Sequence, residues 1–351
     1  MTTYSSLASS LLLVLAACAP ELAQEDAGRL TLAPDTIVAR PVLLRDFSEP
    51  TSTPASTGDQ ILRPLSVRWS AGRLFVSDVG VDRVAVLDSA ARVVRWIGAR
   101  GRGPGELYGV AHIAVRNDRI FVGEALNGRV SEFTIAGRFV KAYASPYAAG
   151  ALSTTARGTL SAARSSTHYA ARLVDGGNPP GALRRARRQQ REAHERWIAL
   201  PGHDLIASDS ATAWVFDQAT GVLCRYAGPH SAGRCHALPA PVIARLRQYR
   251  DNRVAALEAA THQHVESAPL AKDMLRVGAL LAVLVPLPEI PILLIDTTDE
   301  TLTMVTLAGD SLPGWARSAR SFAWDGHGFV FVSDEGIGRF HLSHRHFAEK
   351  P

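Results

Sequence analysis

Lysine is nearly absent from this chain of 351 residues: only three residues are Lys, and Arg supplies almost all of the positive charge. The formal net charge is +5, and a positive balance of this size favours acidic partners or anionic surfaces without specifying one. A bias towards Arg and Ala is also what a GC-rich genome produces. Composition alone therefore assigns no ligand.

The common catalytic and phosphate-binding motifs are also absent. The chain has no G-x-S-x-G sequence of the kind that presents a nucleophilic serine. Its glycine-rich stretch, residues 98–107 (GARGRGPGEL), has Pro104 where a P-loop needs Lys, and its evenly spaced glycines do not form G-x-G-x-x-G. Neither interleaved aromatic residues nor a wider basic stripe accompanies Arg100 and Arg102, so a nucleic-acid partner is not expected.

Long apolar runs are few, and the first lies at the N-terminus. It ends at Cys18, is too short to span a bilayer, which needs ~20 apolar residues, and is typical of a secretory signal peptide. Residues 15–18 (LAAC) resemble a bacterial lipobox, although the preceding residues lack Lys and Arg. The resemblance implies a signal peptide over residues 1–17 and lipidation of Cys18. The alternative is an ordinary secreted protein that is cleaved nearby.

The lipobox resemblance also implies a location. Several acyl chains on Cys18 would hold the protein firmly at a membrane, because each buried CH₂ group contributes ~0.8 kcal/mol. The next residue is Ala19, and not the Asp that signals inner-membrane retention in enterobacterial lipoproteins. The expectation is a lipid-anchored protein of the bacterial cell envelope, at the outer membrane and facing the periplasm.

A second apolar run, residues 277–296, is interrupted by three prolines and by Glu289. A membrane-spanning helix would hardly tolerate so many breaks. Two buried strands around a proline-rich turn fit the pattern better.

Cysteine is scarce as well, with three residues in all. Apart from Cys18, only Cys224 and Cys235 remain, and a pair in an oxidising compartment is expected to form a disulfide. The residues between them contain the Gly and Pro of a reversing loop. A bridge across so short a loop would stabilise the fold by roughly 2–3 kcal/mol in the chain-entropy model. A redox or metal pair is less supported, because the spacing is not C-x-x-C.

What the chain does contain is an internal repeat. Residues 73–76 (RLFV) recur as residues 119–122 (RIFV), an offset of 46 residues, and residues 331–334 (FVSD) match residues 75–78. Weaker copies begin near residues 156, 203 and 278. Each unit consists of short apolar runs split by turns. A unit of ~40–50 residues with four short strands is typical of a β-propeller blade, and the chain after residue 66 has room for six.

The residues GRLFVSDVGVDRVAVLD, followed by IGARGRGPGEL, resemble the NHL-type six-bladed β-propellers found in many bacterial lipoproteins. The resemblance implies an all-β fold of six four-stranded blades over residues 58–346. It also implies that a strand within residues 18–57, for which residues 29–47 are the candidate, pairs with the last blade and closes the ring. The stretch at 98–107 then connects one blade to the next, with Gly and Pro setting its backbone geometry.

Two segments interrupt the repeat as predicted helical insertions. Residues 183–197 contain six Arg and could form a surface for anionic ligands or lipid headgroups, or only a solvated helix or loop. Residues 240–260 have Pro241 at a plausible first helical position, and Val242, Leu246 and Tyr249 recur near helical spacing. This helix should pack on the propeller, as a lid over the channel or as a cover for a blade edge.

The expected function is non-catalytic: a propeller that binds a protein, peptide or glycan at one face, with no cofactor and no metal. The alternative is a lactonase-like or lyase-like enzyme, which could depend on a metal, with its site at the central channel. His112 and Glu124 are the only candidate ligand-binding residues, because they depart from the repeat at inner positions. Asp78, Asp209 and Asp334 recur after Ser, which favours turn-forming roles.

Overall fold

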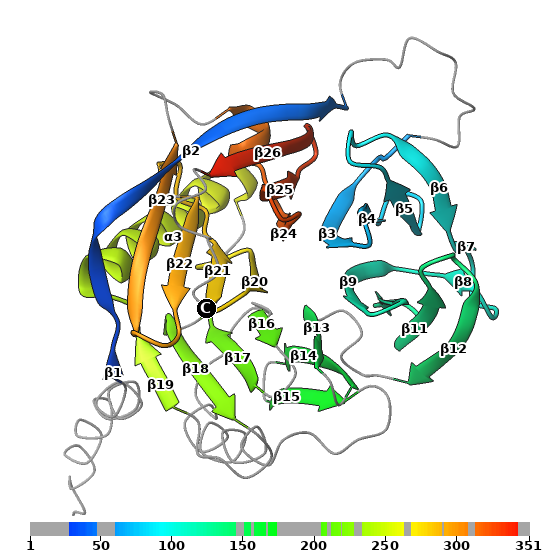
Figure 1. Ribbon diagram of the computed structural model, residues 1–351, viewed down its shortest axis with the longest axis horizontal. Helices are drawn as coiled ribbons and strands as arrows, with labels where there is room; N and C mark the ends of the chain where they lie inside the picture. The colour runs from blue at the N-terminus through cyan, green and yellow to red at the C-terminus, as the bar shows by residue number, and fades with distance from the viewer. Residues whose placement is uncertain are drawn as a thin grey trace, which may run out of the picture.

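The computed structural model describes residues 28–47, 60–144, 151–155, 158–165, 168–173, 205–208, 212–218, 220–227, 234–262, 268–289, 291–307 and 313–342. These residues form six antiparallel β-sheets around a common centre, a six-bladed β-propeller (Figure 1). The predictions for Cys18, Asp209 and residues 183–197 lie outside the described residues.

The six sheets are called blades A to F in chain order, and the predicted fold class is confirmed. Blade A contains β3 (Pro64–Ser70), β4 (Arg73–Asp78), β5 (Arg83–Leu87) and β6 (Val93–Ile97); blade B contains β9 (Val110–Arg116), β10 (Arg119–Glu124), β11 (Arg129–Thr134) and β12 (Phe139–Ala144). Blade C contains β13 (Ala151–Thr155), β14 (Gly158–Ser165) and β15 (His168–Leu173); blade D contains β16 (Leu205–Ser208), β17 (Thr212–Asp217), β18 (Val222–Ala227) and β19 (Arg234–Ala237). Blade E contains β20 (Asp273–Val277), β21 (Leu280–Leu284), β22 (Ile292–Asp296) and β23 (Thr301–Leu307); blade F contains β24 (Ser321–Trp324), β25 (Gly328–Val332) and β26 (Gly336–Leu342).

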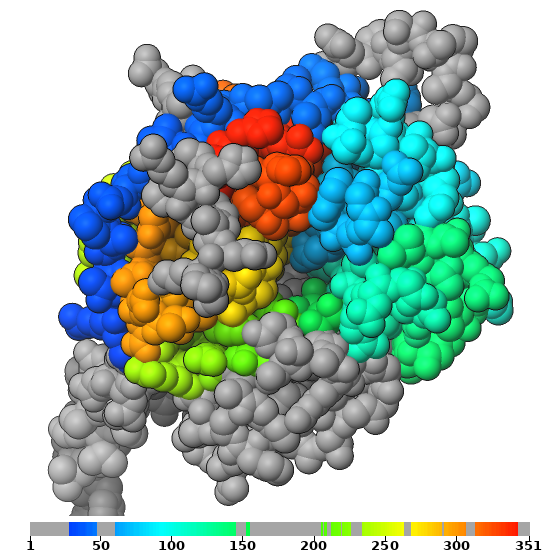
Figure 2. All heavy atoms as spheres, viewed as in Figure 1, coloured from blue at the N-terminus to red at the C-terminus, as the bar shows by residue number. Residues whose placement is uncertain are grey.

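The first strand of each blade lies at the centre of the ring. The six inner strands, β3, β9, β13, β16, β20 and β24, contact one another in this order, and β24 contacts β3. They surround the channel, and Figure 2 shows the visible face hollowed at the ring centre, between blade A in blue and blade E in yellow. The repeat offset agrees with this arrangement, because β4 and β10 begin 46 residues apart.

Apolar side chains pack between neighbouring blades and form the core. Phe75 of blade A and Ile113 of blade B are fully buried in one such layer. Between blades E and F the layer is aromatic: the Phe331 and Phe340 rings lie 4.3 Å apart, and Trp315 packs beside them. Each fully buried side chain of this size contributes about 1.5–3 kcal/mol. The alternating residues of the strands therefore hold the blades face to face.

An N-terminal segment crosses the outer edges of three blades. Its strand β1 (Gly28–Arg29) pairs in parallel with β19 of blade D. The long strand β2 (Thr31–Asp46) then pairs in parallel with β23 of blade E, and its second half pairs antiparallel with β26 of blade F. Figure 1 shows this segment in dark blue along the rim of the ring. It completes blade F as a fourth strand and also connects blades D and E, which the family resemblance does not imply.

Two helices lie in the connections before blades E and F. Helix α3 (Ala240–Thr261) begins after Pro239 and buries Val242 and Leu246 against blades D and E, while Tyr249 packs against the same cluster. The short helix α4 (Gly314–Arg317) precedes β24. The apolar run at 277–296 forms β21 and β22, which pair antiparallel. Within the described part of the chain, no helix is long and apolar enough to cross a membrane.

The glycine-rich stretch at 98–107 connects blade A to blade B. Its short strands β7 (Ala99–Arg100) and β8 (Glu106–Leu107) pair with each other. Gly98 has a φ of +79°, and a Cβ on it would lie 2.5 Å from the Leu107 side chain, so only glycine fits without strain. The Arg129 guanidinium donates hydrogen bonds to the carbonyl oxygens of Arg102, Gly103 and Glu106. The stretch is therefore a blade-to-blade connector.

Candidate functional site

An ion pair at the centre of the ring connects three blades. Arg68 on β3 donates to both carboxylate oxygens of Asp273 on β20, at 2.9 and 3.2 Å. Ser321 on β24 lies between them: its hydroxyl donates to Asp273 and accepts a hydrogen bond from Arg68 at 3.2 Å. The Arg68 and Asp273 side chains are 16% and 6% exposed. The channel wall is therefore crossed by a nearly buried polar network of blades A, E and F.

Backbone groups complete this network. Asp273 accepts hydrogen bonds from the backbone N–H groups of Met274 and Phe322, and Ser321 accepts one from Val67 N–H at 3.1 Å. Arg68 also donates to the carbonyl oxygen of Val67. A buried charge is tolerated when its partner and its hydrogen bonds are present. Each polar group here already has protein partners, which favours a structural role for the network.

Glu124, one of the two candidate ligand residues, is fully buried at the end of β10. One carboxylate oxygen accepts hydrogen bonds from Tyr108 N–H at 3.1 Å and from the Asn127 amide at 2.5 Å. The other accepts from Arg129 Nε at 2.9 Å and from the Ser131 hydroxyl. Glu124 therefore holds the connector before blade B together with the strand after it.

His112, the other candidate, lies half-buried on β9, next to β10 in the sheet. It has interactions of its own within the structure. Its repeat equivalent in blade A is Ser66, whose hydroxyl accepts a hydrogen bond from Ile113 N–H across the blade seam at 3.5 Å. The structure thus places both candidates in blade B, and ligand binding by either stays a prediction.

The aspartates that recur after Ser differ between blades. Asp78 is fully buried and accepts hydrogen bonds from the backbone N–H groups of Leu62, Arg63 and Gly80. The bond to Gly80, two residues on, is the expected Asx turn. Asp334 has a side chain that is 47% exposed and pairs with Arg320 at 2.5 Å. The same repeat position is therefore turned inward in blade A and outward in blade F.

Further cations surround Asp334 and form what we call the E/F cluster, which contains Lys272, Arg253, Arg317, Arg320, Asp334 and Glu335. Lys272 Nζ donates to the carbonyl oxygen of Arg317 at the end of α4, at 3.1 Å. Burial, and then the nearby guanidinium groups of Arg320 and Arg253, lower the pKa of Lys272 to about 8. The cations outnumber the two carboxylates, so the cluster is suited to bind an anionic group.

The backbone before Lys272 is firmly positioned. The buried side chain of Gln218 in blade D donates to the carbonyl oxygen of Ala271 at 2.6 Å and accepts from Ala271 N–H at 2.9 Å. This two-point contact fixes the chain at the start of β20. Sequence reasoning missed the E/F cluster because its residues come from α3, from the two connections and from the turn after β25. The rarity of lysine was the one available signal.

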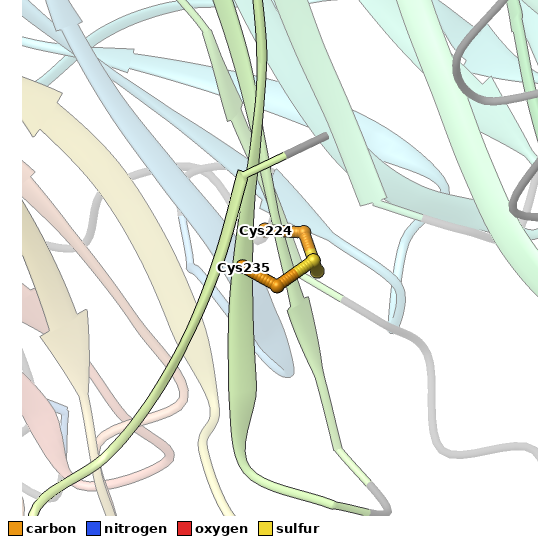
Figure 3. Close-up of a disulfide and its surroundings, with 2 residues drawn as sticks. All are labelled: Cys224 and Cys235. Atoms are coloured by element: carbon orange, nitrogen blue, oxygen red, sulfur yellow. A yellow bond between two sulfur atoms is a disulfide. The ribbon is translucent and has the colours of Figure 1, made fainter. Parts of the chain in front are cut away.

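The predicted disulfide is present. Cys224 on β18 and Cys235 on β19 lie directly opposite each other, with a Cα–Cα distance of 4.0 Å and a bond between the two sulfur atoms (Figure 3). The bridge therefore joins the two outer strands of blade D. Among the described residues, no group of three or more His, Cys, Asp or Glu side chains is placed to hold a metal ion.

Comparisons with known proteins support the fold. No protein-family model and no curated protein matches the chain. A crystal structure of a catalytically inactive virginiamycin B lyase from Staphylococcus aureus with quinupristin is similar, with a TM-score of 0.51, 11% identity, and coverage of 82% of this chain and 97% of that chain. A structure of unknown function from Bacteroides thetaiotaomicron has a TM-score of 0.52 and 10% identity, and the match covers 87% of this chain and 76% of that one. At these identities the likeness concerns the fold alone, and this chain shares that fold: a six-bladed β-propeller.

Proposed function

We propose that this protein is a lipid-anchored, extracytoplasmic binding module that recognises acidic groups of a protein, peptide or glycan at the E/F cluster. The observation that carries the proposal is the excess of cations there. Lys272, Arg253, Arg317 and Arg320 share one region with only two carboxylates, and Arg253 and Arg317 are exposed. A lysine whose pKa is lowered by neighbouring cations gains stability when an anion binds beside it.

The channel supports a binding role over a catalytic one. Arg68, Asp273 and Ser321 bind one another, and the oxygens of Glu124 bind protein donors. A lactonase-like or lyase-like site would need polar groups at the channel that are available to a substrate. The E/F cluster, in contrast, has partly exposed charges on connections outside the strands.

The extracytoplasmic location rests on two features. The disulfide of Cys224 and Cys235 suits an oxidising compartment, and the lipobox-like residues before Cys18 provide the address. An anchor at Cys18 would keep the propeller at the membrane surface, where acidic peptides or glycans of the envelope are its partners.

The scarcity of lysine permits a direct test. Reductive ¹³C-methylation of the full-length protein labels three lysines, and the Lys272 signal is assigned with Lys272→Arg. Titration with an acidic peptide and with a polyuronate should shift the Lys272 signal and leave the signal of Lys141, on β12, unchanged. A neutral peptide and a neutral glycan serve as the uncharged probes.

Variants separate the cluster from general charge effects. Arg320→Gln should weaken binding at least tenfold, whereas Arg138→Gln, which removes an exposed charge from blade B, should leave the affinity unchanged. Equal weakening by both variants, or no shift of the Lys272 signal with any acidic probe, would contradict the proposal.

A further inference from the structure

A second polar pocket lies between blades D and E, away from the E/F cluster. It has a volume of about 350 Å³, which includes its open mouth, and this is at the small end of the range for ligand pockets. Its walls come from β18 and β19 on one side and from the end of β22 on the other. Figure 1 shows β1 at the rim beside β19, and Leu30, which follows β1, lines the pocket.

The disulfide sets the geometry of one wall. Because Cys224 and Cys235 are paired, their neighbours are paired too: Arg225 lies opposite Arg234, and Leu223 lies opposite His236. Successive strand residues point to opposite faces, so these four side chains share the face away from the disulfide. Two guanidinium groups directly across a strand pair repel each other. This wall is therefore suited to an anion that bridges them.

The acidic groups of the pocket are already engaged. Glu300 pairs with Arg234 at 2.6 Å, and Asp296 accepts hydrogen bonds from the N–H groups of Thr298 and Asp299. Arg225 is exposed, and its guanidinium lies 5.9 Å from the centre of the Trp214 ring. Within the described part of the chain, Arg225 has no carboxylate partner. A ligand carboxylate can bind it in the bidentate manner that planar guanidinium groups favour.

His236 supplies a second, independent sign of a ligand. The residue is 8% exposed, and among the described residues its Nδ1 atom has no hydrogen-bond partner. The nearest carboxylate oxygen, on Glu300, is 3.6 Å away. A buried polar atom without a partner costs about 1–3 kcal/mol, so an occupant that satisfies it is favoured. A hydroxyl can donate or accept, and therefore fits either tautomer of the imidazole.

The rest of the pocket is apolar. Leu30, Leu223 and Ile295 are at most 4% exposed, and Trp214 is 2% exposed beneath the guanidinium groups of Arg225 and Arg276. An apolar floor with a few polar groups at its edge is the usual composition of a small-ligand site. It suits the carbon-bound hydrogen face of a sugar ring.

From this arrangement we infer that the pocket binds a carboxylate-bearing sugar, such as a hexuronic acid residue at the end of a glycan. The carboxylate lies between Arg225 and Arg234, a ring hydroxyl contacts His236 Nδ1, and the apolar face of the ring packs on Leu223 and Ile295. The site is separate from the E/F cluster, so it does not depend on the function proposed above.

The experiment titrates the full-length protein with glucuronate, glucose and inorganic phosphate while the imidazole signal of His236 is observed by NMR. The signal is assigned with His236→Gln. Glucuronate should shift it in a saturable manner, and glucose and phosphate should have at most a tenth of that affinity. Phosphate binding as tight as glucuronate, glucose binding as tight as glucuronate, or no shift with glucuronate would each overturn the proposal.

Matched variants locate the site. Arg225→Gln removes an exposed side chain and should weaken glucuronate binding at least tenfold, whereas Arg138→Gln in blade B should not change it. Lys272→Ala should also leave glucuronate binding unchanged, which separates this pocket from the E/F cluster. If Lys272→Ala weakens glucuronate binding as much as Arg225→Gln does, the inference is wrong.

Discussion

Replacement of Asp273 by Ala tests whether the polar network at the channel holds the ring together. The carboxylate accepts hydrogen bonds from two N–H groups of Arg68, from the Ser321 hydroxyl, and from the backbone N–H groups of Met274 and Phe322. Its loss leaves these donors without their acceptor. Removal of one member of a buried ion pair costs ~3–5 kcal/mol. Since Arg68 keeps 16% exposure, we expect the low end, a loss of about 3 kcal/mol of unfolding free energy.

The assay is urea denaturation followed by tryptophan fluorescence and circular dichroism. The control is Asp118→Ala, because Asp118 is 72% exposed in its pair with Arg119, and a surface pair of this kind contributes at most about 1 kcal/mol. The double variant with Arg68→Met and Asp273→Leu should lose less stability than its two single substitutions predict together. A loss below about 1 kcal/mol for Asp273→Ala, or strict additivity in the double variant, would refute the argument.

Three further predictions follow from the same structure. The ¹³C-methyl signal of Lys272 should titrate with a midpoint near pH 8, below the ordinary value of 10.5; because the unfolded chain then binds more protons than the native state between these values, stability should rise with pH across that window, and a midpoint equal to that of Lys141 would contradict it. Cys18→Ser should move the protein from the membrane fraction to the soluble fraction and abolish labelling by fatty acid, whereas an ordinary secreted protein would be unaffected. The double substitution of Cys224 and Cys235 by Ser should lower the free energy of unfolding by roughly 2–3 kcal/mol and weaken glucuronate binding, and unchanged affinity would show that the bridge does not order the pocket wall.

The features that sequence reasoning could predict are those that are repeated or local. The offset of 46 residues places β4 over β10 because each blade needs the same alternation of apolar residues. The helical spacing of Val242 and Leu246 correctly predicts a buried stripe on α3. The pairing of Cys224 with Cys235 follows from the compartment and the short loop between them. In each case the signal lies within a few dozen residues of the chain.

The features that could not be predicted depend on closure of the ring. Arg68 and Asp273 are 205 residues apart in the sequence, and only the circular order of the blades brings them together. The parallel pairing of β1 with β19 and of β2 with β23 also has no local pattern, because an outer strand with mixed polarity fits several edges. The E/F cluster combines three separate connections for the same reason.

The location of the E/F cluster has a physical explanation in the repeat itself. In blades A and B, the carboxylate at the end of the second strand is fully buried and holds its own connector, as Asp78 and Glu124 do. In blade F the equivalent Asp334 is half exposed and pairs with a side chain, while α4 takes over the path of the connector. A position released from its structural task is free to carry charge at the surface. Departures from local consistency are expected at functional sites, so the exposed Asp334, and not the buried Glu124, indicates where this propeller meets its partner.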